Sequence, residues 1–155
     1  GSAAKVELEN TPVDLVSLHS TESHLMARDK KGQFHAIHPR GNPPLVEELN
    51  AVKKLKEFET SPFAEHWLAM DEEGKVFAGP ANSGEWTIVP EDLGKGTSLR
   101  VGKQLSAVRL ESGEWRAWGN KGGGVVEKIN SLGPNVHDLS MDSFDEEKTK
   151  LIWIE

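Results

Sequence analysis

A hairpin pattern that occurs three times is the feature of this sequence that most constrains its fold. Each copy has an apolar segment, a polar turn that contains a glycine, and a second apolar segment; the copies span residues 24–37, 66–79 and 105–119. The turn glycines Gly32, Gly74 and Gly113 lie 42 and 39 residues apart. Glycine suits these turns because a tight hairpin needs a positive φ, which other residues adopt at an energetic cost. The nearly constant period predicts a repeat protein made of short β-strands.

A second repeated segment begins with a β-branched residue and ends four positions later with Asn or Asp. Its copies lie at residues 6–10, 46–50, 88–92 and 126–130, and each is followed by an apolar stretch, at 15–18, 55–58, 99–101 and 139–141. The four copies predict four repeats, with approximate boundaries 5–44, 45–86, 87–124 and 125–155. In the abbreviated last repeat, we expect the second strand near residues 142–144 and the last strand at 151–154. Residues 1–4 are interpreted as a cloning remnant or linker.

The segment from residue 44 to residue 59 is ambiguous. Its apolar residues Leu45, Leu49, Val52, Leu55 and Phe58 fall at helical spacing, which is typical of an amphipathic helix. The repeat register instead favours strand, and tertiary context often overrides local helix propensity. We therefore expect strand here and keep the helix as the alternative.

Composition limits the class of protein. The chain has 155 residues, which suits a single domain, and its 15 Gly and 8 Pro suit many short strands and turns. No apolar run approaches the roughly 20 residues that a membrane-spanning helix needs. The net charge of -7 and the lack of a basic stripe argue against nucleic-acid binding. The absence of cysteine excludes disulfides and thiolate sites but indicates no compartment.

These patterns predict an all-β fold, a small four-bladed β-propeller built from repeats of about 40 residues. A ring buries both faces of every blade and removes the end faces that an open arc would expose. We expect residues 6–10 to lie beside Trp153 and close the ring, which would leave the chain a monomer. An open arc of blades and a three-repeat β-trefoil are the alternatives.

The third copy also resembles a known repeat. Residues 105–124, LSAVRLESGEWRAWGNKGGG, are similar to the repeat of the regulator of chromosome condensation family, and the following residues match it in part: His24, His66, the three turn glycines, Trp118, Gly119, Asn42, Asn82 and Asn120. The resemblance implies β-propeller blades, with this chain a small relative. It does not imply the family's nucleotide-exchange activity, because no motif for that activity is present.

The sequence offers no clear chemistry. Of six histidines, only His35 and His38 form a close pair, and in a strand a three-residue offset points two side chains to opposite faces. No carboxylate completes a zinc spacing, and no nucleophile elbow or phosphate-binding loop is present. His24 and His66 hold equivalent places in their hairpins, which favours structural hydrogen bonds. We therefore predict no catalytic, metal or cofactor residues and no enzyme activity.

Four tryptophans lie in or beside the hairpins and the last strand. Trp115 and Trp118 are three apart on one strand, so they should lie on opposite faces. Trp67, Trp115 and Trp153 are expected to pack in the core, because an aromatic side chain buries a large apolar area. Trp86 follows a loop and is interpreted as a surface residue that could contact a partner.

We expect a protein-interaction module that is part of a larger protein, with a carbohydrate- or small-ligand-binding domain as the alternative. The loops that follow the third strand of each copy should emerge on one face of a ring. The candidate partner-binding residues in these loops are Arg40, Asn42, Asn82, Trp86, Asn120 and Lys121. The asparagines could equally cap turns through bonds to nearby backbone groups.

Overall fold

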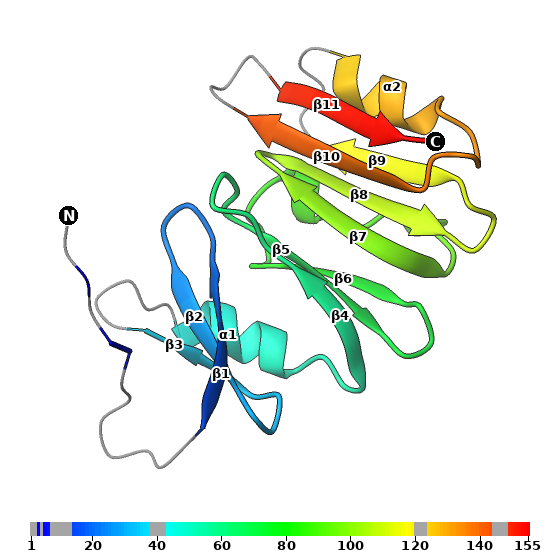
Figure 1. The fold of residues 1–155 in the computed structure, drawn as a ribbon. Coiled ribbons are helices and arrows are strands. Elements are labelled where there is room, and N and C mark those ends of the chain that lie inside the picture. The colour runs from blue at the N-terminus through cyan, green and yellow to red at the C-terminus, as the bar shows by residue number, and fades with distance from the viewer. Residues whose placement is uncertain (1–2, 4, 7–13, 38–42, 120–123, 144–148) are drawn as a thin grey trace.

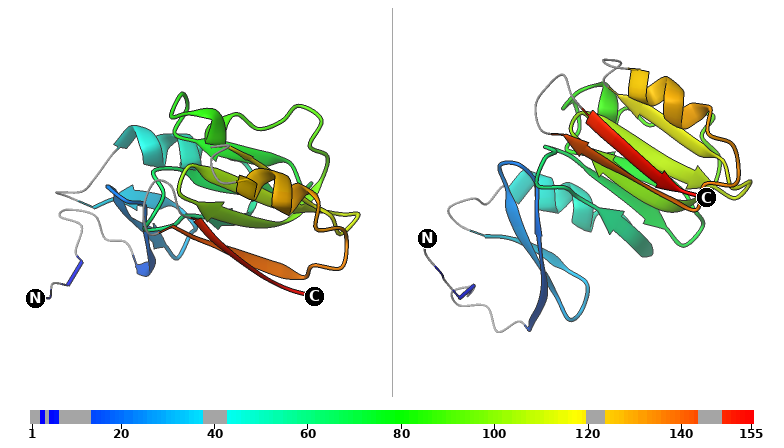
Figure 2. Two further views of the ribbon diagram at one scale, coloured as in Figure 1. Left: turned by 90° about the horizontal axis from the view of Figure 1, so that it is seen from above. Right: turned by 45° about the horizontal axis from the view of Figure 1, so that its top comes forward.

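The protein is all-β, with four small antiparallel sheets that follow one another along the chain (Figure 1). The computed structural model describes residues 3, 5–6, 14–37, 43–119, 124–143 and 149–155. Figures 1 and 2 show the first sheet, in blue, and the fourth, in orange and red, at opposite ends of the series. No helix among these residues is long and apolar enough to cross a membrane.

Three sheets have three strands each, and the fourth has two. The first sheet contains β1 (Leu15–Ser20), β2 (Leu25–Asp29) and β3 (Phe34–Ala36); the second contains β4 (Leu55–Glu59), β5 (Trp67–Asp71) and β6 (Val76–Gly79); the third contains β7 (Gly96–Gly102), β8 (Leu105–Leu110) and β9 (Trp115–Gly119); the fourth contains β10 (Asp138–Ser143) and β11 (Thr149–Ile154). The helical segments α1 (Pro43–Asn50), η1 (Glu85–Thr87) and α2 (Val125–Asn130) each follow the third strand of a sheet.

The predicted hairpins are confirmed. Gly32, Gly74 and Gly113 have φ values of 90°, 83° and 91°, which glycine adopts readily. In the first two turns an aspartate also accepts hydrogen bonds from two backbone N–H groups: Asp29 from Lys31 and Gln33, and Asp71 from Glu73 and Lys75. These bonds replace those that the turn backbone would otherwise make with water.

Neighbouring sheets pack face to face through three apolar clusters. One cluster joins the first and second sheets around Phe34 and Trp67, the next joins the second and third around Leu68 and Leu99, and the last joins the third and fourth around Trp115 and Leu139. Each inner sheet therefore buries both faces. This arrangement explains why β5 and β8 contain almost continuous apolar runs.

The tryptophans lie largely as predicted. Trp115 belongs to the cluster between the third and fourth sheets and Trp118 to the cluster between the second and third, so the two side chains lie on opposite faces of β9. Trp67 is also buried, and Trp153 packs against the cluster around Trp115.

The prediction of strand throughout residues 44–59 is wrong. The first part is α1, and only the second part is a strand, β4. The helix forms because Leu45, Val46 and Leu49 lie on one side of it and are buried in the cluster around Phe34 and Trp67. The equivalent segment near residues 126–130 is likewise helical, in α2.

The fourth repeat also differs from its prediction. Residues 142 and 143 belong to the end of β10, the first strand of this sheet, and residues 151–154 lie in its second strand, β11. Trp153 pairs with Leu139 on β10, and among the described residues β11 has no other neighbouring strand. The predicted closing segment, residues 6–10, falls mostly outside the described residues. The described part of the chain is thus an open series of sheets, not a closed ring.

Candidate functional site: a groove along β6

The structure describes only two of the six predicted partner-binding residues, Asn82 and Trp86. The other four lie outside the described residues: Arg40, Asn42, Asn120 and Lys121. Asn82 is exposed and has a φ of 64° in the turn after β6. Asparagine tolerates this left-handed conformation, which fits the alternative that it serves a turn.

Trp86 has a structural role that the sequence did not predict. Its carbonyl oxygen accepts hydrogen bonds from the Ser106 hydroxyl, at 2.7 Å, and from the Trp118 indole N–H, at 3.0 Å. Its ring lies against Gly84, where an added Cβ would overlap the ring. The residue is half-buried, and its backbone fixes η1 against the third sheet.

His66 and Ser106 form a buried hydrogen-bonded pair between the second and third sheets. The His66 Nε2 and Ser106 Oγ atoms are 2.9 Å apart, and the Ser106 hydroxyl donates to the Trp86 carbonyl. His66 Nε2 therefore donates to Ser106, the reverse of the direction in which a general base activates a serine nucleophile. Burial lowers the pKa of His66 to about 4, which keeps the ring neutral near pH 7. These contacts fit the predicted structural role for His66.

Two asparagines bind the outer edge of a third strand. Asn50, at the end of α1, accepts from the Phe34 N–H at 2.9 Å and donates to the Phe34 carbonyl at 3.0 Å. Asn130, at the end of α2, bonds Ala117 in the same way, at 2.8 and 3.2 Å. In each case one side-chain amide bonds both the N–H and the C=O of a residue on the edge strand, whose backbone groups point away from the neighbouring strand. We call this contact the asparagine clamp.

Among the described residues, no asparagine clamps the edge of β6. Lys75 pairs with Asp71 through the backbone, so alternation along the strand turns the peptide groups of Phe77 and Gly79 toward β5 and those of Val76 and Ala78 outward. By the same alternation, the peptide groups of Phe34 on β3 and Ala117 on β9 point outward. Within the described part of the chain, no hydrogen bond reaches the outward N–H and C=O groups of Val76 and Ala78.

The residues that replace the asparagine explain this difference. Glu91 and Asp92 stand where the repeat places Asn50 and Asn130, and both are exposed. Asp92 instead pairs with Arg116 on β9, with its Oδ1 atom 3.3 Å from Nη2. The segment that follows η1 therefore covers β6 without bonding to its edge.

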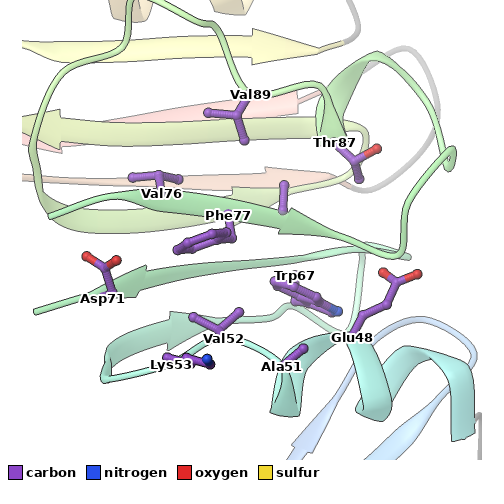
Figure 3. Close-up of a pocket in the computed structure, with 11 residues that line it drawn as sticks. Glu48, Ala51, Val52, Lys53, Trp67, Asp71, Val76, Phe77, Thr87 and Val89 are labelled. Carbon is purple, nitrogen blue, oxygen red and sulfur yellow. The ribbon is translucent and has the colours of Figure 1, made fainter. Parts of the chain in front are cut away.

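A groove of about 680 Å³ runs along this open edge (Figure 3). It lies between the end of α1 on one side and the segment after η1 on the other, and it is lined by Glu48, Ala51, Val52, Lys53, Trp67, Asp71, Val76, Phe77, Ala78, Thr87 and Val89. Figure 3 shows Phe77 on the side of β6 that faces Trp67 and Val52, and Val76 on the side that faces Val89. Residues from both faces of β6 line the groove, so it follows the strand edge itself.

The two carboxylates that line the groove lie at its opposite ends (Figure 3). Glu48 accepts a hydrogen bond from the Ala81 N–H at 2.9 Å, and Asp71 holds the hairpin turn at the other end. The indole N–H of Trp67 is buried and has no acceptor among the described residues. An unpaired buried donor is energetically costly.

The described residues contain no group of three His, Asp or Glu side chains close enough to hold a metal ion. His35 bonds Asp29, with Nε2 and Oδ2 2.8 Å apart, and this hydrogen bond is the main reason the pKa of Asp29 is lowered. No protein-family model matches the chain, and no curated protein matches it either. Only the geometry of the groove therefore suggests a function.

Sequence reasoning did not find the groove. The available signal was the repeated segment, because its third copy, residues 88–92, ends in Asp92 where the copies at 46–50 and 126–130 end in Asn. That difference has a physical meaning only once the asparagine is known to bind a strand edge.

Proposed function

We propose that this chain is a non-enzymatic protein-interaction module and that the groove along β6 binds a segment of its partner. The observation that supports this function most directly is the coincidence of an apolar groove with a strand edge that has no hydrogen-bond partner in the described residues. Apolar walls contribute affinity, and unpaired backbone groups specify the orientation of a bound chain.

Charge favours one kind of partner. The groove is lined by two carboxylates, Glu48 and Asp71, and one amine, Lys53, and the whole chain carries a net charge of -7. A partner segment with lysine or arginine beside its apolar residues would approach such a surface favourably. The proposed ligand is therefore a basic segment with apolar side chains.

A small apolar molecule is the second candidate, because a volume of about 680 Å³ is within the usual range for small-molecule sites. A carbohydrate fits less well. Sugars commonly stack on an open aromatic face, and Trp67 is only 2% exposed. A glycan array and a fragment screen on the same protein would detect these ligands.

We also infer that the four sheets correspond to propeller blades of the kind the third repeat resembles. The stacking of successive sheets through apolar clusters supports this interpretation. The loops with Arg40, Asn42, Asn120 and Lys121 would then form a further contact surface beside Asn82.

A displayed library of random linear peptides, selected on the immobilised protein, tests the proposed function. Ala51 is exposed and lines the groove, so Ala51→Arg should fill the groove and leave the core intact. Asn135→Arg, at an exposed position outside the groove, is the matched control. We expect Ala51→Arg to weaken binding of the selected peptides by more than tenfold, about 1.4 kcal/mol, with both variants melting like the parent.

Two results would contradict this proposal. Either the library yields no specific peptide, or its peptides bind Ala51→Arg and Asn135→Arg equally well.

A further inference from the structure

The groove along β6 has a second property beyond its apolar walls. The outward N–H and C=O groups of Val76 and Ala78 lie in a row at the spacing of a neighbouring strand, with Ala78 half-buried and Val76 7% exposed. In the first and third sheets, an asparagine clamp occupies one outward-facing residue of the corresponding strand. The second sheet alone among these three lacks this clamp in the described residues.

Space is left where the clamp would lie. A second hollow, of about 280 Å³, lies between β6 and the segment after η1 and is lined by Lys75, Val76, Val89, Pro90, Glu91, Leu93 and Gly94. It shares the lining residues Val76 and Val89 with the main groove, so the two hollows adjoin at these side chains.

The walls beside β6 match the alternating side chains of a strand. On one face of β6 lie Trp67, Val52 and Phe77, and on the other lie Val76 and Val89 (Figure 3). Successive side chains of a bound strand point to opposite faces, so each would meet an apolar wall. A helix or a compact ligand would contact the apolar residues on one face of β6 and leave those on the other face exposed to water.

We infer that β6 accepts an extended segment of the partner as an added strand of the second sheet. The added strand would form up to four hydrogen bonds with Val76 and Ala78. Its side chains would alternate between the two walls, and its basic residues would lie near Glu48 and Asp71. This inference rests on the proposed function and specifies how the same groove recognises its ligand.

An N-methyl scan of a library-selected peptide tests this mode of binding. The probe is the tightest-binding peptide that is sensitive to Ala51→Arg, synthesised with one backbone N–H at a time replaced by N-methyl. In an added strand, every second N–H points toward β6 and the others point away. We expect N-methylation to weaken binding by more than tenfold at alternate positions within the bound segment and by less than twofold at the positions between them.

The outcomes separate this inference from the proposed function. Uniform tolerance of N-methylation, or loss at helical spacing, would overturn strand addition and leave groove binding in place. If no selected peptide is sensitive to Ala51→Arg, both ideas fail. The intervening N-methyl peptides are matched controls, because they carry the same added methyl group and the same side chains.

Discussion

Single side chains join the repeats of this protein at places where the backbone cannot bond to itself. Asn50 and Asn130 each occupy the outward backbone groups of a third strand, and His66 joins two sheets through Ser106. A strand edge presents unpaired donors and acceptors that need partners when they are covered. One amide side chain satisfies a donor and an acceptor at once, so asparagine is well suited to this position.

Asn130→Ala should lower the free energy of unfolding by about 1–3 kcal/mol, because two hydrogen bonds to Ala117 are lost beneath α2. Asn135→Ala, at an exposed position in the loop after α2, should change it by less than about 0.5 kcal/mol. Urea denaturation measures both. Equal effects would show that the clamp does not stabilise the protein.

His66 makes stability depend on pH. Its pKa is lowered by burial from 6.5 to about 4, so the folded state favours the neutral ring. The unfolded chain binds a proton first as the pH falls, and the contribution of His66 is complete above pH 6.5 and is lost between pH 6.5 and pH 4. The loss is on the order of 3 kcal/mol.

Urea denaturation of the parent and of His66→Gln at pH 7.5 and pH 4 checks this prediction. The introduced glutamine amide can still donate to Ser106 but does not titrate, so the variant should lose less stability on acidification than the parent. An identical loss in the two proteins would contradict a buried neutral His66.

At the level of elements, turns were easier to predict from the sequence than the segments between them. The turn at Gly74 needs a positive φ, which is a local requirement and is visible in the residue type. The choice between helix and strand in residues 44–59 depended on where Leu45 and Leu49 are buried, which is a tertiary property. The unclamped edge of β6 could not be predicted because the role of Asn50 and Asn130 is not local.

Two turn glycines allow the cost of a strained backbone to be distinguished from the cost of a steric clash. Gly74 and Gly94 have φ values of 83° and 80°, but an added Cβ at Gly74 would lie 3.1 Å from the Gly96 carbonyl oxygen, and at Gly94 it would meet nothing within 4 Å. Gly94→Ala should lower the free energy of unfolding by about 1–2 kcal/mol through the left-handed conformation.

Gly74→Ala should lower it further, because the hairpin turn must also move away from the start of β7, where the Gly96 N–H donates to the Gly74 carbonyl. Thermal and urea unfolding of the two variants provide the comparison. Equal destabilisation would show that the contact between the second hairpin and the third sheet is loose.

The whole molecule exposes apolar residues at both ends of the series of sheets. Val16 and Leu18 on β1 are 63% and 55% exposed, and Ile152 and Ile154 on β11 are 48% and 60% exposed. The inner sheets cover such faces with a neighbour. The sequence predicted a monomer on the assumption that the ring closes, and the described residues do not close it.

We therefore expect concentration-dependent association, with a mass above 17.1 kDa in light scattering. Replacing Ile152 and Ile154 together by Ser should restore the monomer, whereas Thr97→Ser, at an exposed position on β7, should leave the association unchanged. A parent chain that stays monomeric at high concentration would indicate that residues outside the described part of the chain cover these faces.

Hydrogen exchange at single backbone amides tests most directly whether the outer edge of β6 is open. The amides of Val76 and Ala78 face outward without a partner in the described residues, Ala117 is clamped by Asn130, and Phe77 faces β5. We predict that Val76 and Ala78 exchange at least tenfold faster than Phe77 and Ala117, and that a library-selected peptide slows exchange at Val76 and Ala78 while Ala117 is unchanged. Protection of Val76 and Ala78 equal to that of Ala117 in the free protein would mean that the edge is already occupied, and it would contradict both the groove and its proposed ligand.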